Sequence, residues 1–174
     1  MKKILIVVDM QNDFVDGALG TKEAVLIVDN VVDKINNFNG TVIATYDTHF
    51  ENYMNTSEGK NLPVKHCVKG TKGWELNEKV EKSLKNKGYT AIEKITFGSK
   101  DLPEKIIEIT KDEDFSVELI GLCTDICVVS NALLLKAHFP EKEISVDSSC
   151  CAGVTPDSHQ AALTTMKMCQ INVK

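Results

Sequence analysis

The sequence has no excess of positive charge and no long hydrophobic run. Its 20 lysine and arginine residues are outnumbered by 25 aspartate and glutamate residues, which gives a formal net charge of −5 at pH 7. A chain without a basic block is a poor match for nucleic acid or an anionic membrane surface. The amino-terminal run Ile4–Val8 is too short for a signal peptide, and no stretch approaches a membrane span. We therefore expect a cytoplasmic protein that binds a small molecule, with no nucleic acid or membrane partner.

The sequence also lacks the cysteine pattern of a disulfide scaffold or a zinc finger. Six cysteines in a chain without an export signal are expected to be reduced thiols. Cys123 and Cys127 have no second Cys/His pair at finger spacing, and Cys150 and Cys151 are adjacent, so neither pair predicts a structural zinc site. We expect Cys150, Cys151 and Cys169 to be core thiols.

The pattern of apolar residues predicts one α/β domain. The chain has 174 residues, which fits a single domain spanning 1–174, and it contains no repeat or low-complexity segment. Apolar, β-branched runs alternate with amphipathic helical patterns, as in a three-layer αβα sandwich whose mostly parallel, six-stranded Rossmann-like sheet carries helices on both faces. The predicted strands are 3–8, 41–46, 90–94, 116–121, 143–147 and, weakly, 170–173, and the predicted helices are 25–38, 76–84, 103–109, 128–139 and 156–168.

Cys127 is a candidate nucleophile because of the residues that precede it. The apolar run from Val117 to Gly121 predicts a strand, followed by a turn and a helix, so we expect the thiol at a helix N-terminus. There the helix dipole and unpaired backbone N–H groups can lower a cysteine pKa from about 8.5 to roughly 3.5–7.5. Taken alone, Cys127 is equally well interpreted as a buried thiol that only packs.

Charged residues at the ends of two other predicted strands favour a catalytic role for Cys127. Ligands of parallel α/β sheets bind at the carboxyl ends of the strands, where Asp9 follows the first strand and Lys94 ends the third. Asp9 could accept the thiol proton and return it to a leaving group, although an acid in this position is also a common loop cap. Lys94 would favour the thiolate, since lowering the pKa by about 1.5 to 2 units needs only about 2–3 kcal/mol.

Residues 47–73 form the longest segment without periodicity, and a loop of this length is usually functional. The segment holds two of the four histidines, His49 and His66, together with Asp47 and Glu58. Side chains two residues apart on an extended segment point the same way, so Asp47 and His49 can chelate one ion while the loop brings the other two over it. Imidazole and carboxylate ligands suit zinc, iron(II) or manganese, although a polar loop also gathers such residues by chance.

These motifs together resemble the isochorismatase-like cysteine hydrolase family and, within it, the nicotinamidases. The resemblance spans the whole chain and depends on the order of six motifs more than on any one of them. The motifs are Val7–Phe14, Asp47-x-His49, Pro63-x-x-His66-Cys67, Lys94-x-x-Phe97-Gly98-Ser99, Gly121-x-x-Thr124-Asp125-x-Cys127-Val128 and Cys151–His159.

The resemblance implies roles for the residues at the strand ends. Asp9, Lys94 and Cys127 would form a catalytic triad, the Leu122–Cys123 peptide would be cis beside the oxyanion site, and Phe14 would stack on the substrate ring. The implied reaction is metal-dependent hydrolysis of nicotinamide to nicotinate and ammonia through a Cys thioester. Small members of the family often assemble, so a homo-oligomer is compatible with the sequence.

The resemblance also implies one divalent metal ion, with zinc favoured over iron or manganese, bound by Asp47, His49 and His66. Glu58 would match the glutamate that is the fourth ligand in some nicotinamidases. Many nicotinamidases instead have a third metal histidine, and an aromatic residue shortly before the last one. This sequence departs from them, because residues 63–65 are Pro-Val-Lys.

Two alternatives stay open at this point. One is a metal-independent hydrolase of the same family that acts on another amide, a carbamoyl compound or a vinyl ether, and the metal content of the purified protein would distinguish it. The other is a non-catalytic binding or thiol-redox protein, in which Cys127 would be alkylated slowly with no pH midpoint well below 8.5. The pattern does not say whether Trp74 reaches the pocket.

Overall fold

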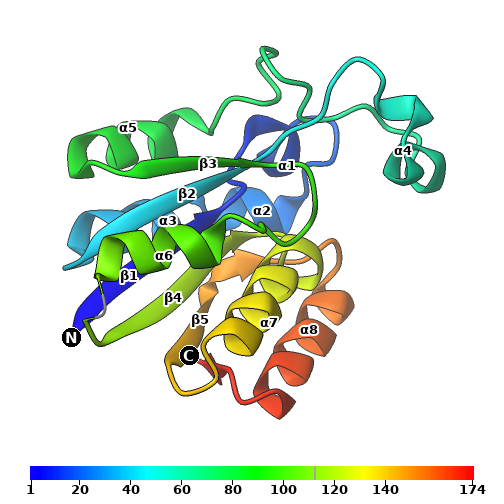
Figure 1. Ribbon diagram of the computed structural model, residues 1–174. Helices are drawn as coiled ribbons and strands as arrows, with labels where there is room; N and C mark the ends of the chain where they lie inside the picture. Colours follow the sequence, from blue (N-terminus) through cyan, green and yellow to red (C-terminus); the bar gives the residue numbers. More distant parts are fainter. Residues whose placement is uncertain (112) are drawn as a thin grey trace.

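A single parallel sheet forms the centre of the computed structural model, which describes residues 1–111 and 113–174 (Figure 1). The strand order is β3-β2-β1-β4-β5-β6, and all pairings between these strands are parallel. The strands are β1 (Lys2–Val8), β2 (Thr41–Asp47), β3 (Thr90–Lys94), β4 (Phe115–Leu122), β5 (Glu143–Ala152) and β6 (Asn172–Val173). The predicted six-stranded sheet is confirmed, although β5 ends at Ala152 instead of residue 147.

Helices cover both faces of the sheet, as Figure 1 shows. Those on one face are α1 (Asn12–Val15), α2 (Lys22–Leu26), α3 (Val28–Asn37) and α5 (Glu78–Lys87), and those on the other are α6 (Leu102–Thr110), α7 (Val129–His138) and α8 (Pro156–Met168). Successive strand residues point to opposite faces, so Leu5 and Val7 of β1 pack in the first core while Ile4 and Ile6 pack in the second. The predicted three-layer sandwich is therefore confirmed. Of the helices described here, none has both the length and the apolar character to cross a membrane.

Several element boundaries differ from the predicted ones. The predicted helix 25–38 is divided at Ile27 into α2 and α3, and α2 begins earlier because the Thr21 side chain accepts a hydrogen bond from the backbone N–H of Ala24. The segment 47–73 contains a 3₁₀ turn, η1 (Tyr53–Asn55), and a short helix, α4 (Ser57–Asn61). Cys169 is exposed, so the prediction of a core thiol at this position was wrong.

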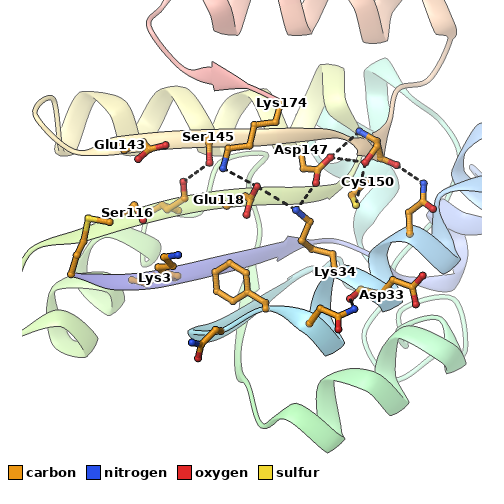
Figure 2. A pocket seen from close by; sticks show the side chains of 18 residues that line it. Lys3, Asp33, Lys34, Ser116, Glu118, Glu143, Ser145, Asp147, Cys150 and Lys174 are labelled. Atoms are coloured by element: carbon orange, nitrogen blue, oxygen red, sulfur yellow. Dashed lines mark hydrogen bonds and ion pairs between the residues drawn. The ribbon is translucent and has the colours of Figure 1, made fainter.

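The face of β4 and β5 beside α3 is polar and partly open (Figure 2). A cavity of about 780 Å³ lies there. Lys34 of α3 forms ion pairs with Asp147 at 2.5 Å and with Glu118 at 3.5 Å, and Lys174 lies 3.2 Å from Glu118. Lys34 and Lys174 thus offset the negative charges of Glu118 and Asp147, each of which stands between buried or partly buried residues of its strand.

We expect the Lys34–Asp147 pair to make stability depend on pH. Burial alone would raise the pKa of Asp147, but hydrogen bonds with Lys34 and Ser149 outweigh it and lower that pKa below its ordinary value. A lowered pKa in the folded state contributes stability above the unfolded pKa of about 3.9, and this contribution disappears as the pH falls through the folded pKa.

The substitution Asp147→Asn should therefore lower the free energy of unfolding by about 1 kcal/mol near pH 7. Urea unfolding should be measured from pH 7 down to about pH 3. The difference in the free energy of unfolding between wild type and variant should shrink as the pH drops below about 4. A difference that is constant over this range would mean that the ion pair is not its source.

Candidate active site

Three residues predicted to be catalytic meet at the carboxyl edge of the sheet. Asp9 directly follows β1, Lys94 is the last residue of β3, and Cys127 follows β4. The Lys94 Nζ lies 2.7 Å from Asp9 Oδ2 and donates a hydrogen bond to Cys127 Sγ at 3.4 Å. All three side chains are buried, so their charges interact with little screening by water.

The backbone around Asp9 is held in a constrained geometry. Asp9 has a φ of 46°, in the left-handed region that non-glycine residues seldom adopt. The hydroxyl of Thr45 donates a hydrogen bond to Asp9 Oδ1 at 2.7 Å. On the neighbouring strand, Gly121 has a φ of +112°, and a Cβ there would lie 2.2 Å from the carbonyl oxygen of Val8. Glycine at 121 therefore lets β4 approach the residue before Asp9 closely.

The predicted lowering of the Cys127 pKa is wrong in direction. Burial raises the pKa of Cys127 well above its ordinary value, the Asp9 carboxylate raises it further, and Lys94 opposes both only in part. Burial also raises the pKa of Asp9 against the opposing charge of Lys94. Cys127 lies inside a π-helical turn, η2 (Thr124–Val128), which leads directly into α7 at Val129, so the expected position near the start of a helix is confirmed. Both shifts favour the neutral thiol and make the Asp9 carboxylate a stronger base.

The four predicted metal ligands lie together at the end of β2 and on the segment that follows it. One ligand atom from each of Asp47, His49, Glu58 and His66 lies within 4.8 Å of those of the others. His49 Nε2 is 2.9 Å from Asp47 Oδ2 and 3.5 Å from Glu58 Oε1, and His66 Nε2 is 3.7 Å and 3.6 Å from the same two atoms. Helix α4 carries Glu58 back over the two histidines, as predicted for a chelating loop.

The donor set fits a divalent cation. His49 Nε2 is buried and has no hydrogen-bond partner in the described part of the chain, although a carboxylate oxygen lies near it. The other ring nitrogen of His66, Nδ1, lies 2.8 Å from the Val64 carbonyl oxygen, which fixes the ring so that Nε2 faces the cluster. Two imidazoles and two carboxylates suit zinc, iron(II) or manganese.

Asp47 links the candidate metal site to the Lys94 group. Its Oδ1 lies 3.2 Å from Lys94 Nζ, while its Oδ2 faces the histidines. Burial alone would raise the pKa of Asp47, but His49, His66 and Lys94 outweigh it and hold that pKa below its ordinary range. The ionised Asp47 carboxylate therefore contacts both Lys94 of the predicted catalytic triad and the two histidines of the candidate metal site.

Two buried residues that the sequence did not single out hold this cluster. Gln11 accepts a hydrogen bond from the Asp47 backbone N–H at 2.8 Å and donates to the Asp47 carbonyl at 2.9 Å. The ring of Tyr53 lies 4.7 Å from that of His49 and 5.1 Å from that of His66. Gln11 belongs to the Val7–Phe14 motif and could have been suspected from it, whereas nothing in the sequence marks Tyr53.

Asn131 of α7 is a third buried residue that the sequence analysis missed. Its side-chain amide donates hydrogen bonds to the carbonyls of Cys127 at 2.8 Å and Phe97 at 3.2 Å, and it accepts one from the Ser99 N–H at 2.8 Å. This residue therefore joins the turn that carries Cys127 to the loop that follows Lys94.

Replacing Asn131 by alanine should leave three backbone groups, two in buried contacts and one in a partly buried contact, without these partners. We expect the free energy of unfolding to fall by about 2–4 kcal/mol, because each unsatisfied buried group costs about 1–3 kcal/mol and partial relaxation recovers some of it. The matched control is Asn30→Ala, which removes an exposed side chain with a single hydrogen bond to the Ser149 carbonyl. Similar urea midpoints for the two variants would contradict this role of Asn131.

The cluster and Cys127 open into one cavity of about 700 Å³. Phe14 and Cys123 also line it, and the Phe14 and His66 rings lie 5.5 Å apart. The Leu122–Cys123 peptide is cis, as the resemblance implied. Trp74 is not among the lining residues described; its indole N–H instead donates to the Thr48 hydroxyl at 2.9 Å.

His159, in the first turn of α8, contacts a residue that is far away in sequence. Its Nδ1 lies 2.7 Å from the hydroxyl of Thr124, 35 residues away in sequence. Thr124 is the first residue of η2, the turn that contains Cys127. His159 therefore supports that turn from helix α8.

Comparison with known proteins places the chain in a family. The model of the isochorismatase domain matches residues 3–173. The Bacillus subtilis protein PncA, described as an uncharacterized isochorismatase family protein, is 32% identical over 94% of this chain and 93% of its own length. A crystal structure of nicotinamidase/pyrazinamidase PncA from Bacillus subtilis has a TM-score of 0.85 at 28% identity and covers 99% of each chain.

A further similar structure is of a protein in complex with zinc. Pyrazinamidase of Pyrococcus horikoshii in complex with zinc has a TM-score of 0.80 at 28% identity, covering 100% of this chain and 99% of its own. The family model and the Bacillus relative both span nearly the whole sequence. The chain belongs to the isochorismatase family.

Proposed function

We propose that the protein is a metal-dependent amidohydrolase that cleaves nicotinamide to nicotinate and ammonia through a thioester on Cys127. The observation that carries the proposal is that the Lys94–Asp9–Cys127 group and the Asp47/His49/Glu58/His66 cluster adjoin one another through Asp47, while Cys127 and the cluster line a single cavity. The nicotinamidase and pyrazinamidase relatives support the choice of a pyridine or pyrazine carboxamide.

Acylation begins with proton transfer from Cys127 Sγ to the Asp9 carboxylate, since Lys94 Nζ contacts both groups and brings them to the same place. The sulfur attacks the carboxamide carbon, and the carbonyl oxygen gains negative charge that the backbone N–H groups of Cys123 and Cys127 would stabilise. Asp9 then returns the proton to the amide nitrogen, the C–N bond breaks, and ammonia leaves. Lys94 keeps a positive charge beside these groups throughout.

Deacylation uses the same carboxylate. Asp9, ionised again, accepts a proton from water, and the resulting hydroxide attacks the thioester carbon. The C–S bond breaks, the sulfur regains the proton from Asp9, and the carboxylic acid product leaves. The raised pKa of Asp9 suits a group that must both accept and donate a proton.

Asp47, His49, Glu58 and His66 would hold the divalent metal ion, with zinc favoured over iron or manganese. When bound, the ion supplies an open coordination position that orients the ring of the substrate relative to Cys127. Phe14 forms a wall of the same cavity and would pack against that ring.

The test is ammonia release from nicotinamide, pyrazinamide and a panel of unrelated amides, measured before chelator treatment, after it, and after reloading with zinc, iron or manganese. We expect activity on the two heteroaromatic amides, its loss with the metal, and about one ion per chain in the active protein. Activity that survives complete metal removal would instead support a metal-independent hydrolase of the same family. No release from any amide would contradict the proposal.

A further inference from the structure

The cavity that holds Cys127 has an inner and an outer zone. The residues of the inner zone are buried, among them Phe14, Asp47 and Cys127. The outer zone consists of apolar side chains that are largely exposed although they line the same cavity. These are Phe50 (52% exposed), Leu62 (38%), Ile95 (69%) and Phe97 (45%).

The outer zone comes from two segments that follow neighbouring strands. Phe50 and Leu62 belong to the segment after β2, which also carries the metal cluster, and Ile95 and Phe97 follow β3 directly after Lys94. The second segment is fixed, because the buried Asn131 amide donates to the Phe97 carbonyl and accepts from the Ser99 N–H. The exposed apolar side chains are therefore presented by an ordered loop.

The outer zone carries no positive charge in its described lining. Apart from the metal cluster and the two cysteines, the lining side chains are neutral, and lysine and arginine are absent from it. An anionic substituent such as a phosphate would find no cationic side chain there, whereas an apolar one would cover side chains that otherwise face water. The whole cavity, about 700 Å³, has the size of sites that bind ligands much larger than one pyridine ring.

We propose that the outer zone binds a neutral, apolar substituent of the substrate, so that ring-substituted heteroaromatic carboxamides are better substrates than nicotinamide itself. This inference rests on the proposed function, since the carboxamide must lie at Cys127. Continuity with the catalytic cavity favours a part of the substrate as the occupant over a second protein chain. A fully buried methylene contributes about 0.8 kcal/mol, close to fourfold in binding. A partly covered propyl group should therefore raise kcat/KM about five- to tenfold, mainly through KM.

The experiment compares nicotinamide with its 5-propyl, 6-propyl and 5-carboxymethyl derivatives. We expect the better propyl derivative to exceed nicotinamide in kcat/KM and the carboxymethyl derivative to fall below it. In the Ile95→Ser variant, kcat/KM for the propyl derivative should exceed kcat/KM for nicotinamide by a factor of only about 1 to 2. The matched control is Ile107→Ser, which changes an isoleucine that is 52% exposed on α6, outside this cavity, and should keep the wild-type ratio.

Each other result contradicts a specific claim. Turnover of nicotinamide with no gain from either propyl group, or a gain that Ile95→Ser leaves intact, would overturn the inference while leaving the proposed function in place. If Ile95→Ser instead converts a dimer to a monomer in sedimentation and the ratio stays unchanged, the outer zone is an interface between copies. No turnover of any amide would contradict the proposed function itself.

Discussion

Cys127→Ala is expected to reduce kcat/KM for the best carboxamide by at least about 10⁴-fold, the largest effect of any single substitution here. The variant keeps the Asp9–Lys94 ion pair but has no sulfur to form the thioester. Water attacking the amide directly would lack both the nucleophile and the intermediate that divides the reaction into two easier steps. Initial rates of ammonia release over a range of substrate concentrations measure the effect.

The control for this substitution is Cys151→Ala. Both cysteines are 4% exposed, so removing either sulfur creates a cavity of similar size and a similar loss of stability, about 1–2 kcal/mol. Cys151 packs in the core with α8 and takes no part in the proposed chemistry. Equal activities of the two variants would show that the loss reflects packing and not nucleophilic catalysis.

Asp47→Asn is expected to have the second largest effect, because it acts on both parts of the site. The substitution removes the negative charge between Lys94 and the two histidines. We expect metal affinity to fall at least about 100-fold and kcat to fall about 10³-fold. Saturating metal should restore binding of the ion but not kcat, since Lys94 would still lack one of its two carboxylate partners.

Glu58→Gln separates these two contributions. Glu58 contacts the histidines from α4, and its described ion pairs do not include Lys94. We expect the metal affinity of the Glu58→Gln variant to fall about 10- to 100-fold. Its kcat should return to within a few fold of the wild-type value when metal is in excess. The measurements are metal titrations by calorimetry and kcat at saturating metal. Full recovery of kcat by excess metal in both variants would contradict a direct link between Asp47 and Lys94.

The sheet and the candidate site residues could be predicted because parallel strands place their carboxyl ends along one edge. Once the apolar runs had indicated β1 to β4, the positions of Asp9, Asp47 and Lys94 followed from where those runs end in the sequence. Cys127 could be added because it follows the fourth strand. The spacing of Asp47 and His49 likewise needed only an extended backbone to bring their side chains together.

The supporting residues could not be predicted, because their partners are distant in sequence. Gln11 contacts Asp47 across 36 residues, and the Asn131 side chain binds Phe97 across 34. The direction of the Cys127 pKa shift was missed for a related reason. It depends on how deeply Cys127 is buried and on how many carboxylates surround the thiol, and neither quantity is contained in the local pattern of residues 117–127.

The most direct test of the central claim is partitioning of the acyl-enzyme with hydroxylamine during turnover of nicotinamide. If a Cys127 thioester forms, hydroxylamine should compete with water for it, so the ratio of pyridine hydroxamate to nicotinate should rise in proportion to hydroxylamine concentration. The rate of ammonia release should stay constant if acylation limits turnover. Nicotinate as the sole product at every hydroxylamine concentration, with undiminished turnover, would contradict a thioester intermediate.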